Sequence, residues 1–318
     1  MIARIAGSRT AIAFISVAVV FAIGSFLISG FASAFSVRAM LVLASLLAVA
    51  SLGQTLVMIL GGIDLSIPFV IGFANVVFAK LYGGGMAAPA VAVIVIVAAA
   101  LIGAFSGAVS SRLRIHPLIV TLGVGTIVQA AVQLWTSGLP TGSAPDFVNQ
   151  FVSLGGNVGP VPVPWLVPSV LALTLIAAFL LLRSIYGRKL YALGANPVAA
   201  ELALVHPEGM WIITFALSAV FAAVSGILLL GFTGASDAGV GMPYLFQTIA
   251  AVVIGGTALI GGRGGFVGTV AGAIVLVEIR TVLVGLGLSE ALVQAALGII
   301  ILALVAAYGR DQHVREMI

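Results

Sequence analysis

Long apolar runs separated by short polar stretches make up most of this chain. They cover approximately residues 11–35, 40–60, 65–82, 87–109, 117–135, 165–182, 210–232, 244–260, 266–286 and 291–308. A helix of about 20 apolar residues crosses a bilayer, and a helix satisfies its own backbone hydrogen bonds in lipid. The pattern therefore predicts an all-α integral membrane protein with about ten transmembrane helices, organised as one transmembrane domain over residues 1–318.

Basic residues distinguish the two sides of the predicted bundle. Cytoplasmic loops of membrane proteins are enriched in Lys and Arg. If the N-terminus is cytoplasmic, ten of the 13 basic residues fall on that side: Arg4, Arg9, Arg112, Arg114, Arg183, Arg188, Lys189, Arg263, Arg310 and Arg315. Arg38, Lys80 and Arg280 fall on the other side. The distribution predicts that both termini are cytoplasmic (N-in, C-in), and it explains the net charge of +4 without a nucleic-acid partner.

A polar stretch, Gly61–Pro68, separates the second apolar run from the third. Gly61 and Gly62 favour the end of one helix, and Asp64 is a suitable N-cap for the next. Pro68 is tolerated in a first helical turn. The stretch therefore predicts a broken helix near Gly61–Asp64. Ionisable residues within membrane segments are expensive and are often functional, so Asp64 is either a structural cap or a direct solute contact.

Uncharged polar residues in the apolar runs are candidates for lining a solute path. With the residues of the break, the candidates are Gln54, Gly61, Gly62, Asp64, Ser66, Asn75, Gln247 and Thr248. The alternative for each is a hydrogen bond that ties neighbouring helices together. Three charged residues near the ends of the last two runs, Glu278, Arg280 and Glu290, are interpreted as interfacial charges, and the alternative is a proton relay.

The composition excludes several classes of protein. The chain is 62% hydrophobic and 7% charged, whereas soluble domains carry about 25% charged residues. It has no cysteine, and its three histidines, His116, His206 and His313, are far apart in the sequence. Neither a Walker A motif for ATP nor an HExxH zinc motif occurs. We therefore expect that the chain is not an enzyme and needs no cofactor or metal.

The stretch Tyr191–Pro207 lies between two runs on the predicted cytoplasmic side. Asn196 is a suitable N-cap and Pro197 fits the first helical position. A short helix to about Val205, stopped by Pro207, is predicted. Such a helix is either a docking element for a soluble partner or a plain amphipathic surface helix.

Four segments are similar to motifs of one transporter family. They are Gly61–Ser66, Arg188–Leu202 with its Tyr-Ala-Leu-Gly-Ala-Asn-Pro core, Ile249–Thr257 and Gly261–Thr269. They occur in the family's order and spacing, and the similarity extends from about Met40 to the end of the chain. On these motifs the chain resembles the permease subunits of bacterial ABC importers for ribose and related sugars.

The resemblance implies a multi-pass protein of the bacterial inner membrane with several partners. These are a cytoplasmic ABC ATPase, a periplasmic sugar-binding protein and a second permease chain, identical or a sister. The resemblance also implies a segment that couples the permease to the ATPase, for which the candidate residues are Gly194, Asn196, Pro197, Ala200, Leu202 and His206.

The function implied is transport of a monosaccharide, such as a ribose-like pentose or a hexose, or of a related polyol. The binding protein would deliver the solute, and ATP hydrolysis on the separate subunit would drive its passage to the cytoplasm. Two alternatives remain open. One is an ABC permease for branched-chain amino acids or nucleosides. The other is a secondary transporter driven by an ion gradient, in which Asp64 would be the ion-responsive group.

Overall fold

Helices make up nearly all of the fold. The structure is a computed structural model that describes residues 2–159 and 161–313, and within these residues no β-strand occurs. The helices are α1 (Ile2–Leu27), α2 (Ala34–Leu60), α3 (Ile67–Gly83), α4 (Ala88–Leu113), α5 (Pro117–Trp135), α6 (Asp146–Val152), α7 (Leu166–Arg183), α8 (Ile185–Ala195), α9 (Pro197–Leu202), α10 (Pro207–Thr233), α11 (Tyr244–Ile254), α12 (Phe266–Gly285) and α13 (Glu290–His313). The all-α prediction is confirmed.

Seven helices are long and apolar enough to cross a membrane. They are α1 from Thr10 onward, α2, α4, α5, α7, α10 and α12. Three further apolar helices are shorter: α3, α11 and the Glu290–Ile300 part of α13. These ten helices correspond to the ten predicted runs, and among the residues whose side chains the structure describes, seven have the length and composition of a full span. The count of ten crossings therefore stays a prediction.

Two stretches differ from the sequence prediction. The eighth run, placed over residues 244–260, forms a helix only to Ile254. With 11 residues, α11 is about 16 Å long, whereas the hydrocarbon core of a bilayer is about 30 Å thick. The chain continues after α11 as a glycine-rich loop rather than as the rest of a span. The second difference is α6, a short helix within the loop predicted over residues 136–164.

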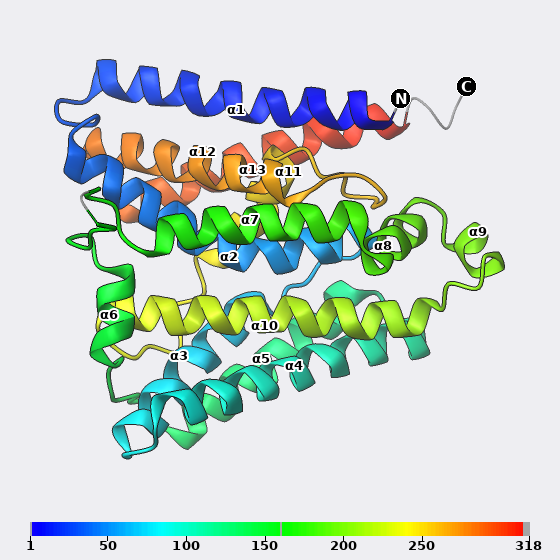
Figure 1. Cartoon of the computed structure of the whole chain (residues 1–318), viewed down its shortest axis with the longest axis horizontal. Coiled ribbons are helices and arrows are strands. Elements are labelled where there is room, and N and C mark those ends of the chain that lie inside the picture. The colour runs from blue at the N-terminus through cyan, green and yellow to red at the C-terminus, as the bar shows by residue number, and fades with distance from the viewer. Residues whose placement is uncertain (1, 160, 314–318) are drawn as a thin grey trace.

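The two ends of the bundle are unlike each other. α1 begins and α13 ends at the end where α8 and α9 project, and α6 lies at the opposite end (Figure 1). The last turns of α4 and α7, which carry Arg112 and Arg183, also lie at the α8–α9 end. This placement agrees with the one-sided charge distribution, and the N-in, C-in orientation stays a prediction.

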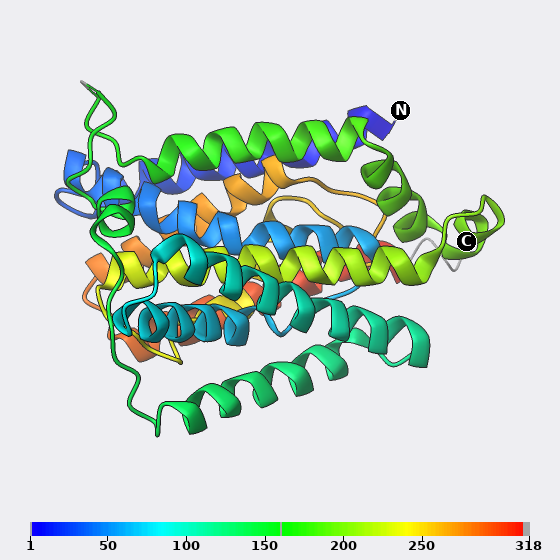
Figure 2. The same cartoon turned by 60° about the horizontal axis from the view of Figure 1, so that its bottom comes forward.

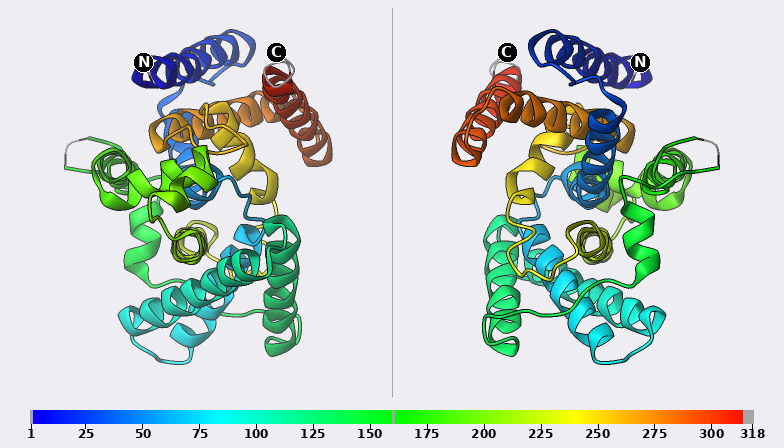
Figure 3. Two further views of the ribbon diagram at one scale, coloured as in Figure 1. Left: turned by 90° about the vertical axis from the view of Figure 1, so that its right-hand side faces the viewer. Right: turned by 90° about the vertical axis from the view of Figure 1, so that its left-hand side faces the viewer.

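The core of the bundle is built around α2 and α10. Every residue of α2 from Ala44 to Leu60 is buried, and α10 packs against α2, α3 and α4. The view along the bundle shows α10 at its centre, with α1 and α13 at one edge and α4 at the other (Figure 3). Small residues allow this close packing. A Cβ atom on Gly103 of α4 would lie 2.2 Å from the Phe215 carbonyl oxygen of α10. Helix α5 packs on α3 and α4 at the edge of the bundle (Figure 2).

Candidate functional site

Residues 61–66 form the break between α2 and α3. Helix α2 ends before Gly61 and α3 begins after Ser66, as the sequence predicts. Gly61 is the C-cap of α2 with a left-handed φ of 96°, and its N–H donates to the Met58 carbonyl at 3.0 Å. The Gly62 N–H donates to the Val57 carbonyl at 2.9 Å. Pro68 lies in the first turn of α3, where no intrahelical N–H bond is lost. The predicted broken helix is confirmed.

Asp64 is placed differently from its predicted role as N-cap. The N-cap of α3 is Ser66, two residues later. The Asp64 Oδ1 atom accepts from the Ser66 N–H at 2.8 Å and from the Ser66 hydroxyl at 2.6 Å, which is the local turn typical of Asp. The N-cap prediction was wrong because this side chain turns inward and closes the loop before the helix, where it is only 1% exposed.

Three neighbouring helices hold the break in place. The Asp64 Oδ2 atom accepts from the Ser218 hydroxyl of α10 at 2.7 Å. The Gln54 Oε1 atom of α2 accepts from the Asp64 N–H at 3.3 Å, and the Thr121 hydroxyl of α5 accepts from the Leu65 N–H at 2.9 Å. Unpaired backbone groups are costly in an apolar interior. These side chains therefore replace the hydrogen bonds that the interrupted helix lacks, and they connect the break to α2, α5 and α10.

The segment α8–α9 projects from one end of the bundle (Figure 1). The Asn196 Oδ1 atom accepts from the Ala199 N–H at 3.0 Å, and Pro197 is in the first turn of α9. The predicted cap is confirmed. The helix ends at Leu202 rather than near Val205, because Leu204 takes a positive φ of 60° and the chain turns back. Pro207 does not stop α9 but begins α10, with His206 as the N-cap of α10.

Removing the Asn196 cap tests the local stability of this segment. Asn196→Ala removes the only side-chain acceptor at the start of a six-residue helix, and lost caps cost about 1 kcal/mol. We expect faster amide hydrogen exchange throughout α9 and unchanged exchange in α10. Asn149→Ala on α6 is a suitable control, since its side chain donates a weaker 3.4 Å bond to the Ala144 carbonyl at the opposite end of the bundle. Equal exchange in α9 of the variant and the parent would contradict the prediction.

The tip of α9 carries an exposed apolar surface. Val198, Leu202 and Leu204, here called the docking tip, are 70%, 84% and 81% exposed. Ala200 faces the other way and is 4% exposed. Isolated apolar residues on a surface are common, but these three lie together on one short projection at the predicted aqueous end.

Glycines join this segment to the break. Gly61, Gly194, Gly261 and Gly262, here called the glycine junction, come from the break, α8 and the loop between α11 and α12. The Gly262 N–H donates to the Ile59 carbonyl at 2.8 Å. A Cβ atom on Gly194 would lie 1.9 Å from that same carbonyl oxygen, and one on Gly261 would lie 2.9 Å from the Gly61 Cα atom. Three backbone segments therefore touch without side chains between them.

Tyr191 strengthens the glycine junction from α8. Its hydroxyl donates to the Gly264 carbonyl at 2.7 Å. Burial raises the pKa of Tyr191 to about 12, because an apolar environment disfavours the phenolate. The hydroxyl therefore stays protonated and remains a donor throughout the physiological pH range.

The remaining path candidates lie in different environments. Asn75 is fully buried; its Nδ2 donates to the Gly226 carbonyl at 3.3 Å, and its Oδ1 accepts from the Asp237 N–H at 2.9 Å. Thr248 is buried and bonds within its own helix, to the Tyr244 carbonyl. Gln247 is half-buried and lines a cavity with Arg280 and Glu290. The structure thus brings Gln54, Asp64 and Ser66 together at the break, and separates Asn75 and Gln247 from them.

The three charges interpreted as interfacial divide into two groups. Arg280 Nη2 pairs with Glu290 Oε1 at 2.9 Å, and both side chains are partly exposed. Glu278 is only 4% exposed, so the interfacial interpretation is wrong for this residue. It lines an apolar cavity between α1, α2 and α12, because it lies on the opposite side of α12 from Arg280.

Several residues at these contacts were not singled out from the sequence. Ser218, Thr121 and Tyr191 are distant in sequence from the groups they bond, and serine and threonine in apolar helices are too common to identify a partner. The Gly261–Gly265 cluster belongs to one of the four family-like segments, and its density of glycine was the available signal for a close backbone approach.

Comparison with known proteins identifies the family. The family described as "Branched-chain amino acid transport system / permease component" matches residues 36–305. The ribose import permease protein RbsC of Haemophilus influenzae is 30% identical over 92% of this chain and 91% of its own length. The autoinducer 2 import system permease protein LsrC of Escherichia coli is 29% identical over 98% of this chain and 90% of its own length. RbsC of Escherichia coli is 30% identical over 83% of each chain. The resemblance read from the four motifs is confirmed, and the chain belongs to this family of transport-system permeases.

Proposed function

We propose that this chain is the membrane-spanning permease subunit of a bacterial ABC importer for a monosaccharide or a related polyol. Its solute would be a ribose-like pentose, a hexose or a polyol, passed from a periplasmic binding protein to the cytoplasm. The observation that carries the proposal is the similarity to a ribose import permease over 92% of the chain. The four motifs and the coupling segment lie within the matched region.

A separate ATPase would supply the energy. The chain has no Walker A motif, so ATP hydrolysis belongs to a partner. The docking tip offers that partner an apolar contact, and Asn196 and Pro197 fix the short helix that carries it. Gly194, Ala200 and His206 would position the segment against the bundle and at the start of α10.

The glycine junction offers a route from this docking segment to the membrane interior. When the ATPase pair closes on ATP, α8 and α9 would move with it. Backbone contacts without intervening side chains leave little room for independent movement, so the displacement would reach Ile59, Gly61 and the break. From there the bonds of Asp64 and Leu65 lead to α10 and α5. Two permease chains would alternate in this way between outward and inward states.

Replacing an apolar residue of the docking tip should weaken ATPase binding. Leu202→Ser removes the most exposed large side chain of α9, and central apolar contacts in interfaces contribute about 1–2 kcal/mol. We expect the dissociation constant for the purified ATPase to rise about 5- to 30-fold, with no change in the unfolding temperature of the permease.

Leu139→Ser is the matched control for this measurement. Leu139 is 79% exposed but lies after α5, at the end of the bundle opposite α9. We expect this variant to bind the ATPase as the parent does. Equal weakening by both substitutions, or none by Leu202→Ser, would contradict a docking role for α9.

Uptake into vesicles tests the proposed function directly. Labelled D-ribose, hexoses, polyols, leucine and a nucleoside would be offered to vesicles containing this chain, with and without its ATPase and binding protein. Each sample would have either internal ATP or an imposed proton gradient. Sugar uptake that requires both partners and ATP supports the proposal. Uptake of leucine or the nucleoside under the same conditions would show that the importer carries that solute rather than a sugar. Gradient-driven uptake by this chain alone would indicate a secondary transporter.

A further inference from the structure

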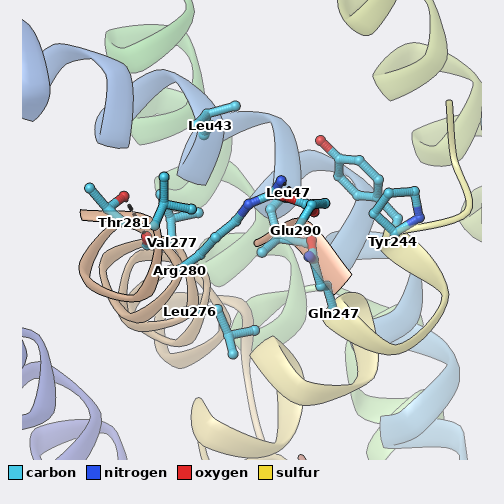
Figure 4. A pocket seen from close by; sticks show the side chains of 11 residues that line it. Leu43, Leu47, Tyr244, Gln247, Leu276, Val277, Arg280, Thr281 and Glu290 are labelled. Atoms are coloured by element: carbon cyan, nitrogen blue, oxygen red, sulfur yellow. Dashed lines mark hydrogen bonds and ion pairs between the residues drawn. The ribbon is translucent and has the colours of Figure 1, made fainter. Parts of the chain in front are cut away.

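A cavity with both polar and apolar walls lies at the end of the bundle away from the coupling segment. It has a volume of about 410 Å³ and is formed by α2, α11, α12 and α13 (Figure 4). The start of α12 is next to the glycine junction, since Tyr191 of α8 bonds to Gly264. Arg280 lies 14 residues farther along α12 than its first residue, Phe266, which corresponds to about 20 Å of helix. The cavity is therefore on the side predicted to face the periplasm.

Polar side chains from three helices line this cavity. Tyr244 and Gln247 come from α11, Arg280 and Thr281 from α12 and Glu290 from α13, and the Thr281 hydroxyl donates to the Val277 carbonyl of its own helix at 2.8 Å. In Figure 4 the ends of Gln247, Arg280 and Glu290 point toward one another. The opposite wall is apolar and includes Leu47 of α2 and the ring of Tyr244. A cavity with an apolar wall and a few convergent polar groups is the usual form of a small-molecule site.

The polar groups suit a neutral polyhydroxylated solute. Arg280 and Glu290 pair at 2.9 Å, so their charges compensate each other. Arginine has five N–H donors and a carboxylate about four acceptor positions, and one bond between them leaves both donors and acceptors free. Sugar hydroxyls both donate and accept, so they can use this mixed set together with the Gln247 amide. A zwitterionic amino acid would instead compete with the ion pair for each charged group.

We propose that this cavity is the periplasmic-side reception site of the permease for its monosaccharide or polyol, with Gln247, Arg280 and Glu290 as the polar contacts and Thr281 at its wall. The cavity volume falls in the usual range for small-molecule sites, about 300–1,000 Å³. This inference rests on the proposed function. It adds the place where the solute first contacts the chain, which is separate from the break at Asp64.

Cysteine protection tests the site without relying on transport. The chain contains no cysteine, so Gln247→Cys and Thr281→Cys each introduce a single thiol into an otherwise native permease. Each variant, reconstituted with its partners, would be labelled with a membrane-impermeant maleimide in the presence of D-ribose, D-glucose, a polyol or leucine. We expect the sugar that is imported to slow labelling at both positions at least threefold. Gln150→Cys on the exposed face of α6 is the control, and no sugar should protect it.

Transport by Gln247→Leu provides a second measurement. The binding protein captures the solute, so it dominates the apparent affinity of uptake. The loss of a permease contact should therefore appear in the maximal rate. One lost hydrogen bond corresponds to a three- to tenfold decrease. Binding-protein-stimulated ATP hydrolysis should remain within twofold of the parent, because Gln247 is remote from α8 and α9. Gln150→Leu should change neither rate.

The outcomes separate this site from the proposed function. Protection at both cysteines by the imported sugar supports the site. If the parent permease imports a sugar that protects neither cysteine, and Gln247→Leu transports normally, the site is overturned and the importer function stands. If no sugar is imported with both partners and ATP, the proposed function fails and the sugar site with it. Protection by leucine rather than by sugars overturns the assignment of a neutral ligand.

Discussion

Replacing Gly194 by alanine is expected to destabilise the permease by about 3 kcal/mol or more and to abolish ATP-driven uptake. A Cβ atom at this position would lie 1.9 Å from the Ile59 carbonyl oxygen and 2.6 Å from the Gly262 nitrogen. Both neighbours are backbone atoms, so no rotamer change relieves the overlap. Overpacking in a core costs typically 1–3 kcal/mol when side chains can adjust, and here α8, α2 and the α11–α12 loop must separate.

The measurement combines thermal unfolding of the purified permease with uptake in the reconstituted importer. Gly209→Ala is the matched control: Gly209 is in the first turns of α10, close to the same end of the bundle, and a Cβ atom there would meet nothing within 4 Å. That control should unfold at or above the temperature of the parent, since alanine favours helix over glycine by about 1 kcal/mol. A Gly194→Ala variant with parental stability and full uptake would contradict the role of the glycine junction.

Local features of the site could be predicted from the sequence because they depend on neighbouring residues. The end of α2 at Gly61 and the tolerance of Pro68 follow from backbone preferences. The cap of α9 by Asn196 follows from the hydrogen-bonding capacity of one side chain next to Pro197. The long apolar runs predict spans for a similar reason, since each helix meets the length requirement of the bilayer by itself.

The contacts that join these local features could not be predicted. Asp64 bonds to Ser218, which is 154 positions away in the sequence, and the choice among many buried hydroxyl groups is made by how α2 and α10 pack. The early end of α11 was missed because Gly255 and Gly256 continue an apolar run, and hydropathy does not register the positive φ of Gly256. The burial of Glu278 likewise depends on α1 and α2 covering one side of α12.

Asp64→Ala is expected to reduce stability by about 3 kcal/mol, whereas Asp64→Asn should cost about 1 kcal/mol or less. Alanine leaves the Ser66 N–H and hydroxyl and the Ser218 hydroxyl without their acceptor, in a position that is 1% exposed. Each buried polar group left unpaired costs about 1–3 kcal/mol. Asparagine keeps the shape and the Oδ1 acceptor for Ser66, and the Ser218 hydroxyl can rotate to accept from the new amide.

The pair of substitutions also distinguishes the two roles considered for Asp64. If Asp64 holds the break in place, uptake should follow stability, so Asp64→Asn should transport at close to the parental rate while Asp64→Ala loses transport together with its folded state.

The matched control is Ser225→Ala. This substitution removes a different buried hydroxyl of α10, one that donates to the Leu46 carbonyl at 2.9 Å, away from the break. A variant Asp64→Asn that unfolds at the parental temperature yet transports nothing would show that the negative charge itself acts on the solute or on a coupled ion. Asp64 would then take part in transport directly rather than only hold the break in place. Asparagine preserves the hydrogen bonds, so a loss of transport would come from the missing charge, which only a contact with the solute or ion requires.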